Sequence, residues 1–269
     1  GAGVPDPPGC PRGTVPGPPG CPRGTVPDLP GRPRAAVLGH DGDMRLILIR
    51  HGQTSSNVAD LLDTAEPGAD LTDLGRQQAS AVPRSLADED IDVVYASTLV
   101  RTQQTAEPLV AERGLELRVR DGVREVRAGD LEMRGDEAAI RAYVGTIFGW
   151  AQDPRRRVPG GENGLEVWQR YDDVIAEAYA DGVETAVVFS HGAVIRSWTA
   201  VRAENVSVEH AAYNPISNTG AVVLEGSPRE GWWAHLWEGR PLGGDRVAAP
   251  QADGPAAEEA PAEAVPSER

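Results

Sequence analysis

Three short runs of apolar, largely β-branched residues are the feature of this sequence that most restricts its fold. They are residues 45–50 (RLILIR), 92–96 (DVVYA) and 185–189 (TAVVF). Apolar runs of this length without polar alternation are typical of strands that are buried on both faces. We therefore predict a sheet whose central strands have helices packed on each side.

Helical patterns alternate with these runs. They cover residues 72–87, 98–112 and 163–181, and Gly114 and Gly182 follow the last two, where a left-handed helix terminus favours glycine. Strands that alternate with helices predict a mainly parallel sheet covered on both faces. The expected fold is α/β, a three-layer αβα sandwich with a mainly parallel central sheet. The segments 218–225 and 232–237 are expected to add strands near the edge of that sheet.

Composition sets the N-terminal part of the chain apart. Residues 1–43 contain 11 of the 23 prolines, no aromatic residue and an 11-residue near-repeat that starts at Gly9 and again at Gly20. Such a segment cannot bury enough apolar area to offset its ordering entropy, so we expect a disordered Pro/Gly-rich extension. Our hypothesis is that Met44 is the true start and that the upstream residues are a gene-model artefact. A mass spectrum of the native protein that shows residues 1–43 would refute it.

The C-terminal part is distinct as well. Residues 245–269 contain four prolines, six acidic residues and two arginines. This composition is typical of a disordered, solvated acidic tail rich in alanine and proline. All 13 aromatic residues lie between Tyr95 and Trp237. We therefore expect the folded domain to be residues 44–244, which is long enough for one α/β domain.

Charge and cysteine content narrow the classes of partner. The formal net charge is −15, all 26 basic residues are arginines, and no basic stretch occurs. Nucleic acids and anionic membrane surfaces require clustered positive charge, so we expect neither as a partner. No apolar run is long enough to span a membrane, no secretory signal is visible, and two cysteines cannot form a disulfide framework. We expect a cytoplasmic protein, either a monomer or a homodimer.

Polar residues follow each apolar run, at the edge of the sheet where ligands of α/β proteins bind. The first run leads into Arg50, His51 and Gly52, with Asn57 close behind; the second leads to Ser97 and Arg101; the third leads to Ser190, His191 and Gly192. Two histidines, each followed by glycine, and two arginines are therefore expected to converge.

This residue set favours phosphoryl chemistry. Arginine presents a permanently charged fork of donors that matches phosphate oxygens, and a neutral imidazole is a competent nucleophile toward phosphorus. A phosphate-binding loop of the GxxxxGK[ST] type is excluded because the chain has no lysine. No HxxxH or Cys/His spacing supplies a third metal ligand beside His51 and His191, so we expect no metal and no other cofactor.

The motif Arg50-His51-Gly52 resembles the signature of the histidine phosphatase superfamily, which has the phosphoglycerate-mutase-like fold. Further matches follow in the order typical of that family: 71–79 (LTDLGRQQA), 95–106 (YASTLVRTQQTA), 123–125 (VRE), 159–162 (PGGE) and 188–192 (VFSHG). The resemblance covers nearly all of residues 45–225. A tripeptide alone arises often by chance, whereas the ordered set is specific.

The resemblance implies roles for individual residues. His51 is the nucleophile that becomes phosphohistidine, and Arg50, Arg101 and His191 bind the phosphoryl oxygens. Glu125 protonates the leaving oxygen and then takes a proton from the attacking water.

Four further residues have supporting roles by the same resemblance. Gly52, Asn57 and Gly192 line the phosphate pocket. Glu162 acts behind the site, for instance by holding an arginine. The natural substrate stays open, because the leaving-group pocket is expected to come from the stretch between Glu125 and Pro159, where Arg127 and Arg134 are candidate contacts.

The implied function is a metal-independent phosphomonoester hydrolase of the histidine acid phosphatase type, which acts through phosphohistidine on a small phosphorylated metabolite. Two alternatives stay open: a 2,3-bisphosphoglycerate-dependent phosphoglycerate mutase, and a non-catalytic phospho-ligand-binding protein. Segment 125–134 (EVRAGDLEMR) lacks the tyrosine and lysine that grip a second anion in mutases of the family. A disordered tail would also leave the phosphoenzyme open to water. Both features favour the phosphatase.

Overall fold

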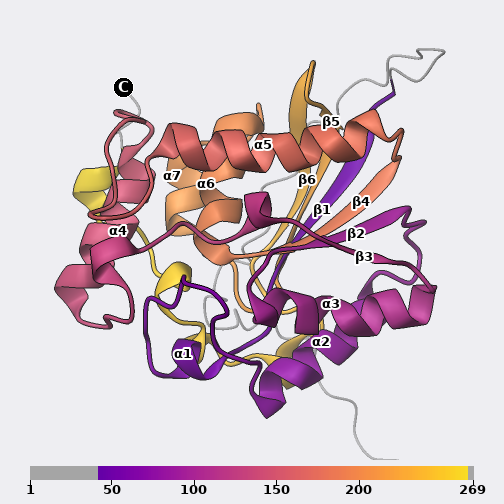
Figure 1. Ribbon diagram of the computed structural model, residues 1–269, viewed down its shortest axis with the longest axis horizontal. Coiled ribbons are helices and arrows are strands. Elements are labelled where there is room, and N and C mark those ends of the chain that lie inside the picture. The colour runs from indigo at the N-terminus through magenta and orange to yellow at the C-terminus, as the bar shows by residue number, and fades with distance from the viewer. Residues whose placement is uncertain (1–41, 266–269) are drawn as a thin grey trace, which may run out of the picture.

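A six-stranded sheet runs through the middle of the molecule (Figure 1). The computed structural model describes residues 42–265, so the expectations for residues 1–41 lie outside the described residues. The strands are β1 (Met44–Arg50), β2 (Val93–Ala96), β3 (Leu117–Val119), β4 (Thr185–Ser190), β5 (Ala221–Ser227) and β6 (Gly231–Glu238). Their order across the sheet is β3-β2-β4-β1-β5-β6.

The sheet is parallel over four strands and antiparallel at one edge. β4 pairs in parallel with both β1 and β2, and β2 pairs in parallel with β3. β5 runs antiparallel to β1 and to the edge strand β6. The prediction of a mainly parallel sheet, with the strands near 218–225 and 232–237 at its edge, is confirmed.

The described residues contain seven α-helices, most of which cover the two faces of this sheet (Figure 1). They are α1 (Ser55–Val58), α2 (Asp73–Ser85), α3 (Val100–Arg113), α4 (Glu137–Gly149), α5 (Gly164–Ala180), α6 (Gly192–Arg202) and α7 (Val208–Tyr213). The three helices expected from the sequence are α2, α3 and α5. Gly114 caps α3 in the left-handed conformation, with φ of 66°, as its position predicts.

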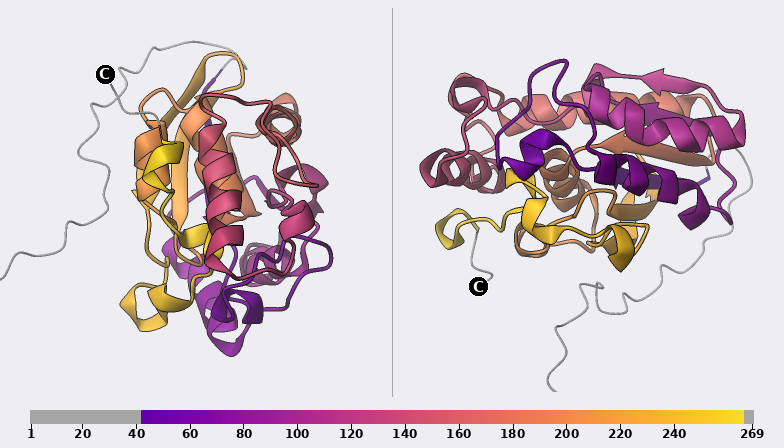
Figure 2. Two further views of the ribbon diagram at one scale, coloured as in Figure 1. Left: turned by 90° about the vertical axis from the view of Figure 1, so that its left-hand side faces the viewer. Right: turned by 90° about the horizontal axis from the view of Figure 1, so that it is seen from below.

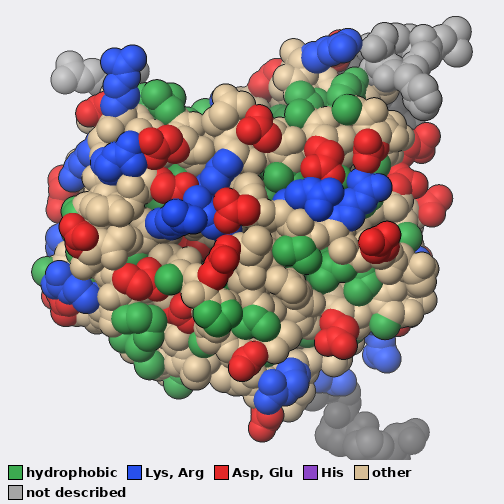
Figure 3. All heavy atoms as spheres, viewed as in Figure 1, with side chains coloured by type: hydrophobic (Ala, Val, Ile, Leu, Met, Phe, Trp, Pro, Cys, Tyr) green, Lys and Arg blue, Asp and Glu red, His purple; other side chains and the backbone are tan. Residues whose placement is uncertain are grey.

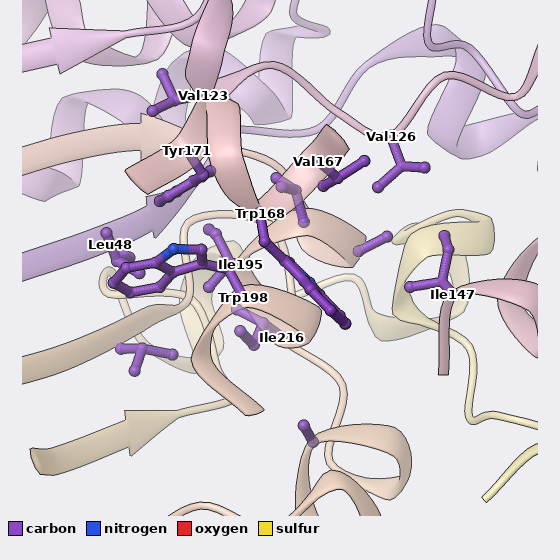
Figure 4. Close-up of a cluster of buried hydrophobic side chains, with 14 of the residues drawn as sticks. Leu48, Val123, Val126, Ile147, Val167, Trp168, Tyr171, Ile195, Trp198 and Ile216 are labelled. Atoms are coloured by element: carbon purple, nitrogen blue, oxygen red, sulfur yellow. The ribbon is translucent and has the colours of Figure 1, made fainter. Parts of the chain in front are cut away.

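Alternation along the strands builds two cores, one on each face. In β1, Leu46 and Leu48 face the core that α4, α5, α6 and α7 cover, while Ile47 and Ile49 face the core under α2 and α3. The larger core is centred on aromatic residues such as Trp198, whose ring lies 5.0 Å from that of Tyr171 (Figure 4). Successive side chains of a strand point to opposite faces of the sheet, and both faces are apolar here. Helices therefore pack on both faces, which gives the three-layer architecture.

The helix α4 was not expected from the sequence, because it lies in the stretch between Glu125 and Pro159 that we assigned to a variable pocket. Asp136 caps it by accepting a hydrogen bond from the Ala139 amide, and the helix buries Ile140 and Ile147 against the sheet. It therefore belongs to the core as well as to the neighbourhood of the site.

The C-terminal segment differs from the expected disordered tail. Residues 245–265 form four short 3₁₀ turns that lie against the domain, and Pro255 and Ala260 are buried (Figure 2). The fully buried Arg196 of α6 donates to the backbone carbonyls of Ala256 (3.0 Å) and Glu258 (2.9 Å). Disorder was expected because the segment has few apolar side chains, but hydrogen bonds to its backbone carbonyls attach it to the domain. The folded part therefore extends beyond residue 244.

Arginines and acidic residues are interspersed on the face drawn in Figure 3. Many of them form exposed pairs, such as Arg157 with Glu166 and Arg118 with Asp181. Within residues 42–265, no helix combines the length and apolar character needed to cross a membrane.

Candidate active site

Two histidines from neighbouring strands meet at the carboxyl end of the sheet. His51 follows β1 and His191 follows β4, and these strands pair in parallel with Arg50 opposite Ser190. The two imidazole rings lie 5.1 Å apart, measured between centroids. The convergence expected from the strand ends is thus present in the structure.

The hydrogen bond of His51 determines its tautomer. The Nδ1 atom lies 2.8 Å from the carbonyl oxygen of Gly52, and a carbonyl only accepts, so Nδ1 carries the proton. The Nε2 atom then keeps its lone pair. Burial, and then the positive charges of Arg101 and Arg50, lower the pKa of His51 well below 6.5. His51 is therefore a neutral imidazole with a nucleophilic Nε2.

His191 is oriented by a serine from a third strand end. Its Nε2 lies 2.8 Å from Oγ of Ser97, which follows β2, while its Nδ1 is buried and has no hydrogen-bond partner in the described residues. Burial lowers the pKa of His191 well below 6.5, and the positive charge of Arg101 lowers it further. The role of Ser97 was not predicted, although its place directly after a strand was the available signal.

Backbone carbonyls hold the two expected arginines. Arg50 donates from Nη1 to the carbonyl of Ile216 (2.7 Å) and from Nη2 to the carbonyl of Asp253. Arg101 donates from Nη2 to the carbonyl of Asp63 (2.8 Å). Nε of Arg50, and both Nε and Nη1 of Arg101, are buried without a hydrogen-bond partner in the described residues.

Buried donors without partners mark this place as an anion site. Ten buried side-chain nitrogen and oxygen atoms lack a hydrogen-bond partner within residues 42–265, and four of them belong to Arg50, Arg101 and His191. Leaving such donors unpaired costs free energy, which an anion with several acceptor oxygens would recover. No cluster of three His, Cys, Asp or Glu side chains suited to a metal occurs in the same part of the chain.

A small cavity lies at this edge of the sheet, and Glu125 lines it together with Arg50, His51 and Arg101. Its Oε1 accepts hydrogen bonds from the amides of Val126 and Val194, both at 2.9 Å. Its Oε2 accepts one longer bond, of 3.1 Å, from the amide of Ala193 in the first turn of α6. Backbone amides therefore fix the carboxylate, and Oε2 keeps the greater capacity to exchange a proton with a ligand.

Glu162 lies behind the site, between two arginines. It accepts hydrogen bonds from Arg124 (2.7 and 2.9 Å), from Nε of Arg170 (3.0 Å) and from the Arg127 amide (3.0 Å). Burial alone would raise the pKa of Glu162, but the hydrogen bonds and charges of Arg124 and Arg170 lower it to about 2. The carboxylate is thus ionised at neutral pH.

Arg170 extends this ion-pair cluster to the catalytic segment. It donates to the carbonyls of Gly122 (2.7 Å), Arg124 (2.8 Å) and Glu125 (3.1 Å). Glu162 and Arg170 therefore hold the segment that carries Glu125 against α5. Nothing in the sequence pattern pointed to Arg170.

The two expected pocket glycines allow close packing. The amide of Gly52 donates to Oγ1 of Thr105 (2.9 Å), and a Cβ at Gly52 would lie 2.7 Å from the carbonyl oxygen of Gly75 in α2. A Cβ at Gly192, the first residue of α6, would lie 3.2 Å from Nε of Arg50. The Gly52 amide thus already has a partner, whereas Gly192 leaves room beside the Arg50 guanidinium.

Asn57 lines the cavity from α1. Its Oδ1 accepts from the amide of Thr54 (3.0 Å) and from Nδ2 of Asn218 (3.3 Å). Asn218, which the sequence analysis had not singled out, also donates to the carbonyl of His51 (3.0 Å) and so ties the two segments together.

A larger cavity of about 350 Å³ adjoins the small one, and Thr64 lines both. Its other lining residues are Ala65, Glu66, Arg124, Arg127, Gly129, Glu132 and Gly160. Arg134 instead pairs with Asp136 at the surface. Of the two arginines expected near the leaving group, only Arg127 therefore faces the cavity.

Comparison with known proteins agrees with this geometry. A family model described as histidine phosphatase superfamily (branch 1) matches residues 46–239. The chain is 35% identical over 223 residues to the PE-PGRS family protein PE_PGRS11 of Mycobacterium tuberculosis, an alignment that covers 76% of this chain but only 38% of that longer protein.

Shorter relatives match over most of their length. A glucosyl-3-phosphoglycerate phosphatase of Mycobacterium tuberculosis is 27% identical over 191 residues, which is 68% of this chain and 85% of that protein. A solved structure of the mycobacterial glucosyl-3-phosphoglycerate phosphatase has a TM-score of 0.62 at 26% identity, and the match covers 73% of this chain and 99% of that one. A 2,3-bisphosphoglycerate-dependent phosphoglycerate mutase of Rhizobium meliloti is 32% identical over 162 residues, 56% of this chain and 76% of that protein.

Proposed function

The chain belongs to the histidine phosphatase superfamily, and on this basis we propose that it is a metal-independent phosphomonoesterase that forms phosphohistidine on His51. The observation that carries the proposal is the neutral imidazole of His51, with Nε2 available, beside the unpaired buried donors of Arg50, Arg101 and His191. Such a site combines a nucleophile with positive charge already in place for the transition state.

In the first step, Nε2 of His51 attacks phosphorus while the bond from phosphorus to the leaving oxygen breaks. The free N–H groups of Arg50 and Arg101 donate to the phosphoryl oxygens as charge builds on them. Nδ1 of His191, which is buried without a hydrogen-bond partner in the described residues, donates as well in the tautomer in which Oγ of Ser97 donates to Nε2. Glu125, in its protonated form, donates a proton to the leaving oxygen through Oε2.

In the second step, water attacks the phosphohistidine. Glu125, now ionised, takes a proton from that water, and the bond between Nε2 and phosphorus breaks. Inorganic phosphate leaves, and His51 returns to its neutral tautomer because Nδ1 kept its proton on the Gly52 carbonyl throughout. After the second step Glu125 is protonated again and the His51 ring is neutral again, as both were before the first step.

A small phosphorylated metabolite is the substrate class that fits the two cavities. The small cavity accommodates the phosphoryl group, and the adjoining 350 Å³ cavity is large enough for a small leaving group. The activity named for the mycobacterial relative, removal of phosphate from glucosyl-3-phosphoglycerate, supports this class.

A phosphoglycerate mutase is the second candidate. One relative carries that name, and the C-terminal segment covers the site, as a mutase needs in order to shield phosphohistidine from water. The absence of lysine and of a tyrosine in segment 125–134 still favours the phosphatase.

Hydrolysis of p-nitrophenyl phosphate, with and without EDTA, tests the proposal. We expect turnover that survives EDTA and a loss of at least about 10⁴-fold in His51→Ala, because no other group there can accept the phosphoryl group. His235→Asn is the matched control, since His235 pairs with Glu225 on β5, away from the site. Brief exposure to labelled substrate should leave acid-labile, base-stable phosphate on His51. Substantial turnover by His51→Ala would overturn the covalent mechanism, and no turnover by the intact chain would favour the non-catalytic phospho-ligand-binding alternative.

A further inference from the structure

Residues 252–257, which we term the strap, lie next to α1 (Figures 1 and 2). Pro255 and Ala256 form part of the wall of the small cavity. The side chain of Asp253 is buried, and its Oδ1 accepts from the amide of Asn218 at 3.2 Å. At the start of the strap, the carbonyl of Ala252 lies 3.4 Å from Nε2 of Gln53.

The strap occupies a donor that a phosphoryl group would use. Nη2 of Arg50 donates to the carbonyl oxygen of Asp253, while Nη1 is taken by the carbonyl of Ile216 within the domain. The two terminal nitrogens of arginine form the fork that binds phosphate oxygens in pairs. With the strap in place, only Nε of Arg50 is without a hydrogen-bond partner in the described residues.

The strap also restricts the space. Pro255 and Ala256 of the strap line the small cavity and narrow the space beside His51. A ligand that takes Nη2 of Arg50 can therefore bind only after the strap has shifted.

Hydrogen bonds attach the strap to the domain, and the strap buries little apolar surface. Arg196 donates to the carbonyls of Ala256 and Glu258, and beyond the strap the amide of Ala260 donates to the carbonyl of Ala212 (3.1 Å). Pro255 is the one apolar residue of the strap that is buried, so little apolar area is lost when the strap opens. The strap has one acidic residue, Asp253, and it lines a cavity that also contains Arg50 and Arg101.

We propose that the strap is an intramolecular ligand of the phosphoryl site, which competes with phosphorylated ligands for Arg50. The inference rests on the proposed function in one respect, namely that the site binds phosphate. The strap depends on Gly254, which has φ of +76° and where a Cβ would lie 2.8 Å from Nδ2 of Asn57. A side chain at this position would push the strap away from the site.

The test is the affinity of the full chain for inorganic phosphate, measured by isothermal titration calorimetry. Gly254→Ala should bind phosphate about tenfold more tightly, because the competing closed state is depopulated. Gly244→Ala is the matched control, since Gly244 also has positive φ (72°) but has nothing within 4 Å of its Cβ position. Asp253→Ala, which loses the anchor to Asn218, should act in the same direction as Gly254→Ala and serves if that variant does not fold.

An acetylated and amidated peptide of residues 250–259 provides a second measurement. Added to Gly254→Ala, it should weaken phosphate binding again in a saturable way. Phosphate affinity that is equal in all variants, weaker in Gly254→Ala, or absent throughout would overturn the inference. Because calorimetry requires no turnover, a chain that hydrolyses nothing but binds phosphate more tightly in Gly254→Ala would refute the phosphatase and leave the strap standing.

Discussion

Two arginines set the protonation of the two histidines in the site. Arg50 and Arg101 are nearly as buried as His51 and His191, so their charges act through little solvent. Desolvation and these charges lower both histidine pKa values in the same direction. The neutral form that the proposed attack of His51 on phosphorus requires is therefore retained at pH values where an ordinary histidine would be protonated.

We expect His51 and His191 to remain neutral when the pH falls through 6.5, where an ordinary histidine takes up a proton. In Arg101→Met, loss of the nearby positive charge should raise the pKa of both rings toward 6.5. Nitrogen-15 NMR of labelled imidazole rings measures this, with the His51 signal assigned by its absence in His51→Asn. A wild-type His51 signal that titrates near pH 6.5 would contradict the electrostatic account.

Glu125→Gln tests the proton transfer to the leaving group. We expect a loss of roughly 10²–10⁴-fold with glycerol 3-phosphate, whose alkoxide needs protonation. The loss should be smaller with p-nitrophenyl phosphate, whose leaving group is stable without a proton. Steady-state rates on the two substrates decide the matter. Equal losses on both would make Glu125 a structural residue, or show that dephosphorylation limits both reactions.

At the scale of elements, three strand ends and one helix N-terminus place the site. The parallel pairing of β4 with β1 and β2 brings His191 next to His51 and Ser97. The first turn of α6 directs two amides at Glu125. The segment that carries Glu125 has no strand or long helix of its own, so its position depends on Arg170 and Glu162 of the α5 region.

We expect Glu162→Gln to lower the free energy of unfolding by about 3 kcal/mol, because it removes the counter-charge of the buried Arg170 and leaves the buried Arg124 with Asp121 alone. Glu166→Gln is the matched control: it breaks an exposed pair with Arg157 and should cost less than about 1 kcal/mol. Urea denaturation measures both. Equal effects would mean that Glu162 contributes no more than a surface pair.

The lowered pKa of Glu162 predicts that the effect of Glu162→Gln on the free energy of unfolding depends on pH. The pKa of Glu162 is lowered to about 2 from its ordinary 4.5, so its contribution to stability is fully present above pH 4.5 and is lost as the pH falls toward 2. The stability difference between wild type and Glu162→Gln should therefore narrow between pH 4.5 and pH 2. A stability difference that is constant over this range would mean that the ionisation of Glu162 does not cause the effect.

At the scale of the whole molecule, the C-terminal segment changes one argument about the reaction. A disordered tail was expected to leave the phosphoenzyme open to water, whereas residues 245–265 contain four 3₁₀ turns, and Pro255 and Ala256 line the small cavity beside His51. The preference for a phosphatase now depends on segment 125–134. There Glu132 accepts hydrogen bonds from the amides of Thr64 and Ala65 and brings a negative charge to the larger cavity.

We expect the release of inorganic phosphate from 3-phosphoglycerate to exceed its conversion to 2-phosphoglycerate when 2,3-bisphosphoglycerate is added. The reason is that the larger cavity lacks lysine and tyrosine, and that Glu66 and Glu132 in its wall offset the positive charges of Arg124 and Arg127. Phosphate release and isomerisation measured in one reaction mixture separate the two functions. Isomerisation that outpaces phosphate release would establish the mutase.

Five of the six strands, the helices α2, α3 and α5, and the convergence of His51, His191, Arg50 and Arg101 could be predicted from the sequence, whereas the short edge strand β3 was missed. Those features depend on local periodicity and on the rule that parallel strands present their carboxyl ends at one edge. Only the tertiary structure decided which partners these side chains have: Ser97 for His191, Arg170 for the Glu125 segment, and the carbonyl of Asp253 for Arg50. The physical reason is that such contacts join residues far apart in the chain, and the last two are made to backbone carbonyls, which every residue has and which therefore leave no pattern in the sequence.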